Sequence, residues 1–259
     1  MKKFGRQARK FNPRIPHMSA LLALRPSLSA PPPASCDWTT KLPANLGVMK
    51  NDILGDCTCA GFYHALQVWT SITESAMDTE SDSNVEALYE QACGYDPKKG
   101  GEGDGGVEQD VLTYLMNTGA PVGPGGSARH KIAAFIEVDP RNQNDVKATI
   151  NDCGVAYIGF EVPSFLMDEA GGVPPVWDIQ PFDGAVLGGH CVILAGYDAN
   201  GVKVISWGEF FTMTWAFFAQ YVDEVYALAD ADWINTQGTS PGGLTLEVLE
   251  GQMQALKEA

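Results

Sequence analysis

Basic residues are scarce outside the first segment of the chain, and this limits the partners that it can bind. The 259 residues include 17 Lys and Arg against 32 Asp and Glu, which gives a formal charge of −15. Nucleic-acid binding needs clustered cations that neutralise phosphates, so the acidic body argues against a nucleic-acid partner. The first 36 residues differ, because they carry seven basic side chains and no acid. Such a basic arm either lies back on the acidic body or reaches an acidic partner.

Long apolar runs are also missing. No run of eighteen apolar residues occurs, whereas a membrane-spanning helix needs about 20, so no membrane contact is expected. The apolar run from Met18 to Leu24 is short for the hydrophobic part of a signal peptide, and Pro26 ends it. Six cysteines in a long chain without a clear export signal are expected to be reduced. We expect a cytoplasmic protein, with a virion or secretion as alternatives.

Recognised metal and phosphate motifs are absent. The Gly-rich stretch from Tyr95 to Gly106 is not followed by Gly-Lys-Ser/Thr, so it is not a phosphate loop. Its acidic residues lack the spacing of a calcium loop. Cys57 and Cys59 with His64 do not form a zinc pattern. We therefore expect neither a metal nor a cofactor.

The most informative stretch is Asn-Asp-Ile-Leu-Gly-Asp-Cys-Thr-Cys-Ala-Gly, residues 51–61, a polar turn that runs into a helical pattern. The apolar face of that helix is formed by Phe62, Ala65, Leu66, Trp69 and Ile72. Cys57 therefore lies at the first helical turn, where free backbone N–H groups and the helix dipole favour a thiolate. The sequence predicts a reactive thiol with a lowered pKa. The alternative is a small buried core residue, as most cysteines are.

A second stretch, Gly-Gly-His-Cys-Val-Ile-Leu-Ala-Gly-Tyr-Asp at residues 188–198, supplies a histidine. A catalytic cysteine needs a histidine that is near in space rather than in sequence, which makes His190 the candidate base. The alternative is a structural histidine. His17, His64 and His130 lack a comparable setting.

Hydrophobic periodicity changes from helical to strand-like along the chain. Helices are expected from Cys57, from a cap at Asn84, and over a face that ends before Gly119. Further on, a short helix is expected over residues 145–151 and another over 215–221. Strands are expected over 155–162, 191–194, 202–207 and 225–228, with an Asn-Gly hairpin turn at 198–201. A helical lobe followed by an antiparallel β lobe is an α+β pattern.

We accordingly divide the chain into four parts. Residues 1–35 form a basic, Pro-rich arm, and residues 36–125 form the helical lobe with the nucleophile helix. Residues 126–235 form the β lobe with the histidine, and residues 236–259 form a helical tail that follows Pro241-Gly242-Gly243.

Taken together, six motifs resemble the papain-like cysteine peptidases in their order along residues 36–233. They are Asp37-Trp38, Gly55-Asp56-Cys57, Gly105-Gly106, Gly188-Gly189-His190, Gly196-Tyr197 and Ser206-Trp207-Gly208. The turn that contains Cys57 looks closer to bacterial and phage-associated members with Gly-x-Cys-Thr. The resemblance implies a two-lobe fold with an active-site cleft between the lobes, a cysteine nucleophile and no cofactor.

The resemblance also assigns an oxyanion donor. In the family, a Gln six residues before the nucleophile donates its amide to the oxyanion. Asn51 stands six residues before Cys57, whereas Ile53, which cannot donate, stands six residues before Cys59. This requirement favours Cys57 over Cys59 as the nucleophile. The side chain of Asn51 is one methylene shorter than Gln.

The group that orients the histidine differs from the family pattern. The family has Asn immediately before Ser-Trp-Gly, and here that residue is Ile205. Either Ser206, a backbone carbonyl or water orients His190, or the site is impaired. Trp207 is expected to shield the ring.

Three glycines and Trp207 are expected to bind the substrate. Gly105 and Gly106 match the family's pair that binds an extended peptide through its backbone. Gly189 leaves room for that peptide beside His190.

Two functions follow. The first is a papain-like cysteine peptidase that acts on a peptide or protein substrate. The alternative is a catalytically impaired papain-fold protein that binds or assembles, for instance in a phage particle, through its basic N-terminal arm.

Overall fold

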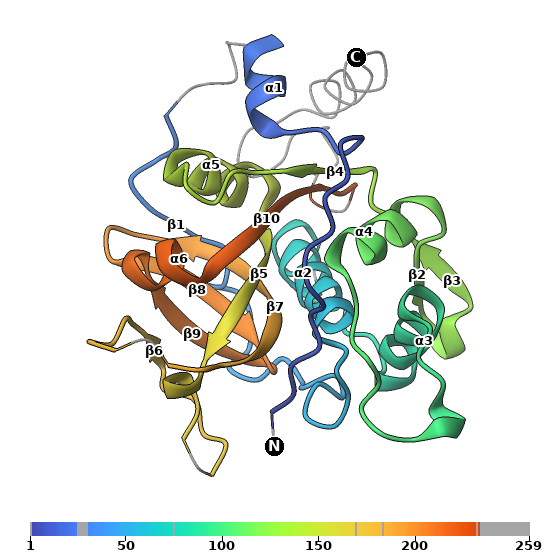
Figure 1. Ribbon diagram of the computed structural model, residues 1–259. Helices are drawn as coiled ribbons and strands as arrows, with labels where there is room; N and C mark the ends of the chain where they lie inside the picture. The colour runs from blue at the N-terminus through green and yellow to red at the C-terminus, as the bar shows by residue number, and fades with distance from the viewer. Residues whose placement is uncertain are drawn as a thin grey trace.

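The computed structural model describes residues 2–24, 31–74, 76–168, 170–182, 184–231 and 233 (Figure 1). The helical tail expected over residues 236–259 lies outside these ranges.

The helical lobe is built around one buried helix, α2 (Cys57–Thr73), which begins at Cys57 as predicted. The helices α3 (Asp82–Cys93) and α4 (Glu108–Asn117) lie beside it (Figure 1). The expected cap of α3 was wrong, because the hydroxyl of Ser81 accepts the Asn84 N–H and the helix starts at Asp82. A separate hairpin joins β2 (Ala120–Val122) to β3 (Ala128–His130).

The β lobe contains an eight-stranded sheet in which only the β6–β9 pair is parallel among the strands that the structure describes. Its path is β4 (Ala134–Glu137), β10 (Val222–Ala229), β5 (Ala156–Pro163), β7 (Val186–Tyr197), β8 (Gly201–Ser206), β9 (Glu209–Thr214) and β6 (Val176–Trp177), and β1 (Cys36–Asp37) pairs with β7. The remaining helices are α1 (Met18–Leu24), α5 (Gln143–Cys153) and α6 (Trp215–Tyr221), with short 3-10 turns η2 (Pro97–Lys99), η3 (Pro124–Gly126) and η4 (Ser164–Leu166).

This arrangement confirms the predicted α+β class with a helical lobe and a β lobe. The expected hairpin between β7 and β8 is present, closed by the Asp198 N–H on the Gly201 carbonyl at 3.0 Å. Strand β7 is longer than the predicted range 191–194, since it begins at Val186 and includes Gly188 and Gly189. Both glycines pair with β5, so strand pairing outweighs their low β propensity.

Helix α2 joins the two lobes, because its buried face packs on the sheet. The Tyr157 hydroxyl on β5 donates to the Thr58 carbonyl at 2.7 Å, at the start of α2. Near the other end, the Trp69 indole donates to the Cys153 carbonyl at 2.8 Å. The two ends of α2 are therefore fixed to the β lobe by one buried and one partly buried hydrogen bond.

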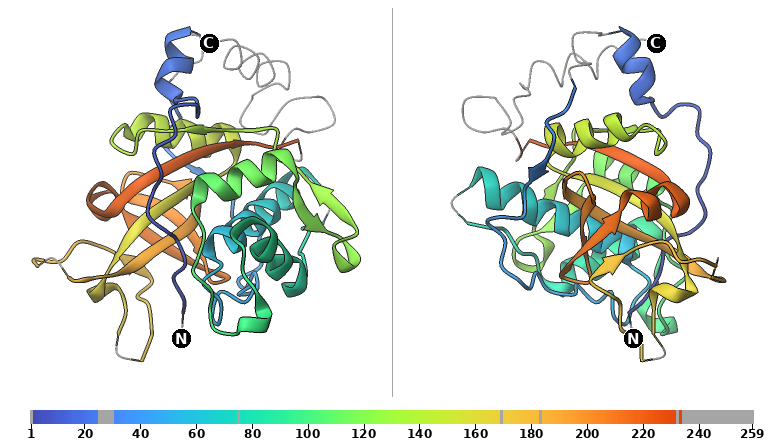
Figure 2. Two further views of the ribbon diagram at one scale, coloured as in Figure 1. Left: turned by 45° about the vertical axis from the view of Figure 1, so that its right-hand side comes forward. Right: turned by 90° about the vertical axis from the view of Figure 1, so that its left-hand side faces the viewer.

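The N-terminal segment of residues 2–17, which we call the arm, lies along the junction of the two lobes (Figures 1 and 2). Its basic side chains form ion pairs with acidic residues of the body. The pairs are Lys2 with Glu209, Lys3 with Glu102, Arg9 with Glu137 and Lys10 with Asp110. In this structure the arm lies back on the acidic body.

Within the ranges given above, none of the helices is long and apolar enough to cross a membrane.

Replacing Trp69 with alanine is expected to destabilise the fold strongly. The side chain is fully buried and its indole N–H is bonded, so truncation leaves a cavity and an unpaired carbonyl, at a cost of about 3–5 kcal/mol in the free energy of unfolding. Denaturant titration measures this change. The matched control is Phe182→Ala, whose side chain is 63% exposed, and which should change the unfolding free energy by less than about 0.5 kcal/mol. Equal effects of the two substitutions would contradict the assigned core.

Candidate active site

The Cys57 sulfur lies where the helical lobe, the β lobe and the arm meet. Cys57 is the first residue of α2 and is 1% exposed. The backbone amides of Cys191 and Gly5 lie close to its sulfur and partly offset the effect of burial on the pKa of its thiol. Cys191 directly follows His190 on β7, and Gly5 belongs to the arm. The candidate nucleophile therefore lies against the peptide unit that carries the candidate base.

The ring of His190 is held by Ser206 and Trp207, the two residues that follow Ile205. Its Nε2 lies 2.8 Å from the Ser206 hydroxyl, and its ring stacks on Trp207 with centroids 4.3 Å apart. Ile205 is fully buried in the core. Of the orienting groups left open by the sequence, Ser206 is thus the one in place, and Trp207 covers the ring as expected.

The second ring nitrogen, Nδ1 of His190, is buried and has no hydrogen-bond partner among the residues that the structure describes. Nε2 is already occupied by Ser206. Nδ1 is therefore the nitrogen left to exchange a proton.

The arm runs through the site in an extended conformation. The Gly106 N–H donates to the Gly5 carbonyl at 2.7 Å, and the Gln7 N–H donates to the Gly106 carbonyl at 2.8 Å. On the other side, the Arg6 N–H donates to the Gly189 carbonyl at 3.0 Å. Arg6 is bridged in parallel to Gly106 and antiparallel to Gly189. The arm thus pairs with the same backbone that was expected to bind substrate.

These close approaches require glycine. A Cβ at Gly105, where φ is +81°, would lie 2.0 Å from the Gly5 carbonyl oxygen. A Cβ at Gly189 would lie 2.5 Å from the Arg6 carbonyl oxygen, and one at Gly5 would lie 1.8 Å from that of Gly55. Any side chain at these positions would push the arm out of the site. The Phe4 ring completes the cover, with its centroid 5.6 Å from that of His190.

Burial under the arm shifts both candidate catalytic groups toward their neutral forms. It raises the pKa of the Cys57 thiol to about 12 and lowers the pKa of His190 to about 3, with the Lys2 ammonium adding to the second shift. The lowered thiol pKa expected from the helix N-terminus was therefore wrong for the arm-covered state. Loss of hydration outweighs the helix dipole and the nearby backbone amides of Cys191 and Gly5.

The amide of Asn51 is used within its own loop in this conformation, and its role as an oxyanion donor stays a prediction. Its amide nitrogen donates to the Leu54 carbonyl at 3.2 Å and to Asp56 Oδ1 at 3.0 Å. Both N–H groups are used inside the loop, because this short side chain folds back onto a carboxyl group whose burial raises its pKa to about 8. The backbone N–H of Cys57 at the helix start is a further candidate donor to the oxyanion.

The rival residues lie in structural settings. Cys59 is fully buried, with its sulfur 3.9 Å from that of Cys93. His64 pairs with Gln67 at 2.9 Å. All six cysteines are free, and no group of three or more His, Cys, Asp or Glu able to hold a metal occurs in the described ranges.

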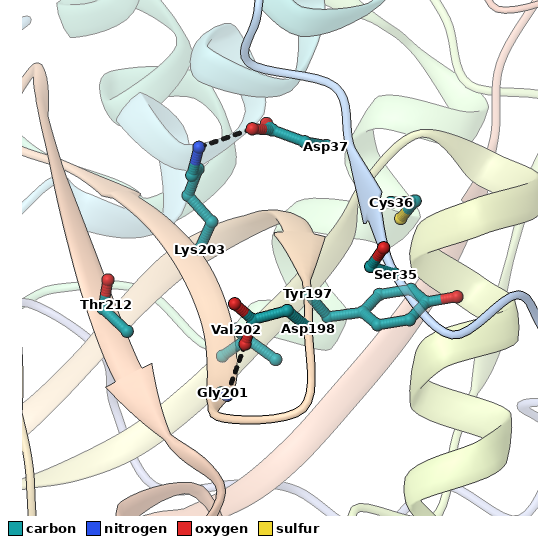
Figure 3. Close-up of a pocket in the computed structure, with 9 residues that line it drawn as sticks. All are labelled: Ser35, Cys36, Asp37, Tyr197, Asp198, Gly201, Val202, Lys203 and Thr212. Carbon is teal, nitrogen blue, oxygen red and sulfur yellow. Dashed lines mark hydrogen bonds and ion pairs between the residues drawn. The ribbon is translucent and has the colours of Figure 1, made fainter.

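Two pockets differ in their relation to this site. One of about 660 Å³ flanks the arm and includes Gly188 and Gly189 in its wall. The other, of about 450 Å³ (Figure 3), lies at β1 and the β7–β8 hairpin, where Lys203 is paired with Asp37 at 2.6 Å. The second pocket contains none of the residues singled out as catalytic or substrate-binding.

Comparison with solved structures shows a papain-like fold. The chain is similar to xylellain, a cysteine protease from Xylella fastidiosa, with a TM-score of 0.65, 16% identity, and coverage of 89% of this chain and 97% of that one. It is also similar to a procathepsin B from Trypanosoma congolense, with a TM-score of 0.59, 14% identity, and coverage of 88% and 87%. The digestive procathepsin L 3 of Tenebrio molitor gives a TM-score of 0.54 at 14% identity, over 88% and 76% of the two chains. No family model matches the chain, and no curated protein sequence matches it.

Replacing Gly5 with alanine is expected to expose Cys57. The new Cβ collides with the Gly55 backbone, so the arm must leave and water must reach the thiol. Alkylation of Cys57 by iodoacetamide at pH 7.5, followed by mass spectrometry, should be at least about tenfold faster than in the unchanged chain, because exposure removes the burial that raises the thiol pKa.

The matched control is Ala8→Ser, at an exposed position of the arm, which should leave the alkylation rate unchanged. Equal rates for the Gly5→Ala and unchanged chains would show that the arm does not shield Cys57.

Proposed function

We propose that the protein is a papain-like cysteine peptidase with Cys57 as nucleophile and His190 as base. The observation that carries the proposal is the setting of His190. Its ring is fixed between Ser206 and Trp207, its free Nδ1 is buried, and the backbone amide of the next residue, Cys191, lies close to the Cys57 sulfur. The turn from Gly55 to Thr58 supports the bacterial type of this peptidase within the proposal.

In the proposed reaction, the proton of the Cys57 thiol passes to Nδ1 of His190, and the sulfur attacks the peptide carbonyl carbon. The oxygen of the tetrahedral intermediate is stabilised by the N–H of Cys57. His190 then gives its proton to the leaving amine as the C–N bond breaks. Water, deprotonated by His190, hydrolyses the resulting thioester and restores the thiol.

Ser206 acts as a positioning residue in this proposal. Its hydroxyl holds Nε2, which fixes the ring orientation and leaves Nδ1 for the thiol proton. A hydroxyl is a weaker hydrogen-bond partner for an imidazolium than the family's amide oxygen. The role is nevertheless the same, namely to select one tautomer and one rotation of the ring.

The proposed substrate is an extended peptide or protein segment that takes the path of the arm. Gly106 and Gly189 offer backbone groups on the two sides of that path, as their hydrogen bonds to the arm show. Such a substrate must displace residues 4–7 before Cys57 can reach a carbonyl carbon. The proposal therefore places the arm-covered chain in a resting state.

Substitutions made in the Gly5→Ala chain test these roles. Cys57→Ala and His190→Ala are expected to abolish cleavage of a fluorogenic peptide library. Ser206→Ala should reduce kcat by about 10–100-fold with little change in KM, because it disturbs ring orientation rather than substrate binding. Cys59→Ala is the matched control and should keep its activity.

Cleavage that persists in the Cys57→Ala chain would overturn the assignment of the nucleophile. If Cys57 in the Gly5→Ala chain reacts no faster than a free thiol and no peptide is cut, the peptidase proposal fails and the non-cutting alternative remains.

A further inference from the structure

The side chain of Arg6 fills a pocket made of carboxylates. Its Nε lies 3.0 Å from Glu224 Oε2 and 3.4 Å from Glu108 Oε1, and its Nη2 lies 2.7 Å from Asp223 Oδ1. The side chains of Glu108 and Glu224 are fully buried, whereas Asp223 is 46% exposed at the rim. One guanidinium thus faces three carboxylates at the junction of the lobes.

The pocket is supported by residues outside the arm. Glu108 stands in the first turn of α4. Glu224 stands on β10, where the Tyr226 hydroxyl donates to its Oε1 at 2.7 Å, and Gln109 donates to that hydroxyl at 2.9 Å. Glu224 is therefore fixed by the body of the protein and not only by Arg6.

Glu108 retains unused capacity to accept hydrogen bonds. Both of its carboxylate oxygens are buried, and neither accepts a hydrogen bond from the described part of the chain. Burial and the neighbouring Glu224 raise its pKa, and Arg6 opposes that rise. A buried carboxylate without hydrogen-bond donors favours a ligand that brings both positive charge and N–H donors.

Gly159 keeps the pocket open. It lies in the middle of β5 between Ile158 and Phe160, and its φ is outside the left-handed region. Backbone conformation therefore does not demand glycine here. A Cβ at this position would lie 2.1 Å from Arg6 Nε and 2.5 Å from Glu108 Oε1, so the missing side chain is the space that the guanidinium occupies.

The position of the pocket relates it to the proposed reaction. The Arg6 backbone is bridged to both Gly106 and Gly189, and the backbone amide of the preceding residue, Gly5, lies close to the Cys57 sulfur. The pocket therefore receives the side chain next to the residue that covers the thiol.

We propose that this pocket, formed by Glu108, Gly159 and Glu224 with Asp223 at its rim, is a specificity pocket that selects an arginine side chain of the substrate. Arg6 is the chain's own occupant of that pocket. That the bound arginine belongs to a substrate rests on the proposed peptidase function. The preference of the pocket for arginine does not depend on catalysis.

Arginine is preferred over lysine for a geometric reason. The guanidinium contacts Glu224 and Glu108 through Nε and Asp223 through Nη2. A lysine ammonium is a single point charge that cannot reach three separated carboxylates in this way. A neutral side chain would leave Glu108 and Glu224 buried without a counter-charge, which is strongly unfavourable.

A binding experiment tests the preference without requiring cleavage. The full chain with Arg6→Ala and Cys57→Ala has an empty pocket and no nucleophile. Fluorescence anisotropy compares two labelled peptides, Lys-Phe-Gly-Arg-Gln-Ala, which is the arm sequence at residues 3–8, and the same peptide with citrulline for arginine. Citrulline has nearly the same shape but no charge. We expect the arginine peptide to bind at least about tenfold more tightly.

Added substitutions locate that preference. Glu224→Gln should reduce the ratio between the two peptides to near one, and Gly159→Ala should weaken the arginine peptide by filling its space. The matched control is Glu161→Gln, an exposed carboxylate on the same strand as Gly159, which should keep the ratio. Equal binding of the two peptides, or a ratio that survives Glu224→Gln, overturns the proposal.

Chemical rescue covers the case in which Arg6→Ala does not fold. Millimolar methylguanidinium should then restore the yield of folded protein or raise its Tm, and the neutral methylurea should not. Rescue by both compounds to the same extent, or by neither, contradicts a cation-selective pocket.

Cleavage assays separate this inference from the proposed function. In the chain that carries both Gly5→Ala and Arg6→Ala, with Cys57 intact, substrates with arginine should be cut at least about tenfold faster than the citrulline analogues. Selective binding without any cleavage supports the pocket and rejects the peptidase. Cleavage with no preference for arginine supports the peptidase and rejects the pocket.

Discussion

The packing of α2 on β7 fixes the rest of the site, because it brings the Cys57 sulfur close to the backbone amide of Cys191. It joins the first turn of α2 to the middle of β7, so the helical lobe and the β lobe cannot shift without separating the thiol from the peptide unit next to His190. The hydrogen bond from Tyr157 to Thr58 supports the same junction from β5. Because the core on both sides of α2 is closely packed, the geometry of the two candidate catalytic residues depends on the docking of the lobes.

The arm determines the chemical state of that site. It covers Cys57 and His190, and the resulting loss of hydration moves the thiol and the imidazole toward their neutral forms. Its own attachment is electrostatic and backbone-mediated. The basic residues of the arm form ion pairs with acidic residues on both lobes, and its backbone pairs with Gly106 and Gly189. The strong charge asymmetry between the first 36 residues and the remainder thus has a structural counterpart in the docked arm.

The sequence predicted the parts of the site that depend on local pattern. Cys57 at a helix start, His190 on a strand after two glycines, and the hairpin at residues 198–201 follow from turn residues and periodicity. The hydrogen-bond partner of the Asn51 amide could not be predicted, because the sequence does not show whether this short side chain reaches an oxyanion or the buried Asp56. The Arg6 pocket was missed because its members are far apart in sequence and a lone Glu usually indicates a solvated surface. The available signal was Gly159, a glycine inside an otherwise bulky buried strand.

The most direct test of the central claim is an NMR titration of the His190 ring in the Gly5→Ala chain, with and without Cys57→Ala. If the two residues form a coupled pair once the arm is displaced, the thiolate favours the imidazolium, and the pKa of His190 falls when Cys57 is removed. A His190 titration that is the same in both chains would show that the sulfur and the imidazole do not interact and would contradict the account.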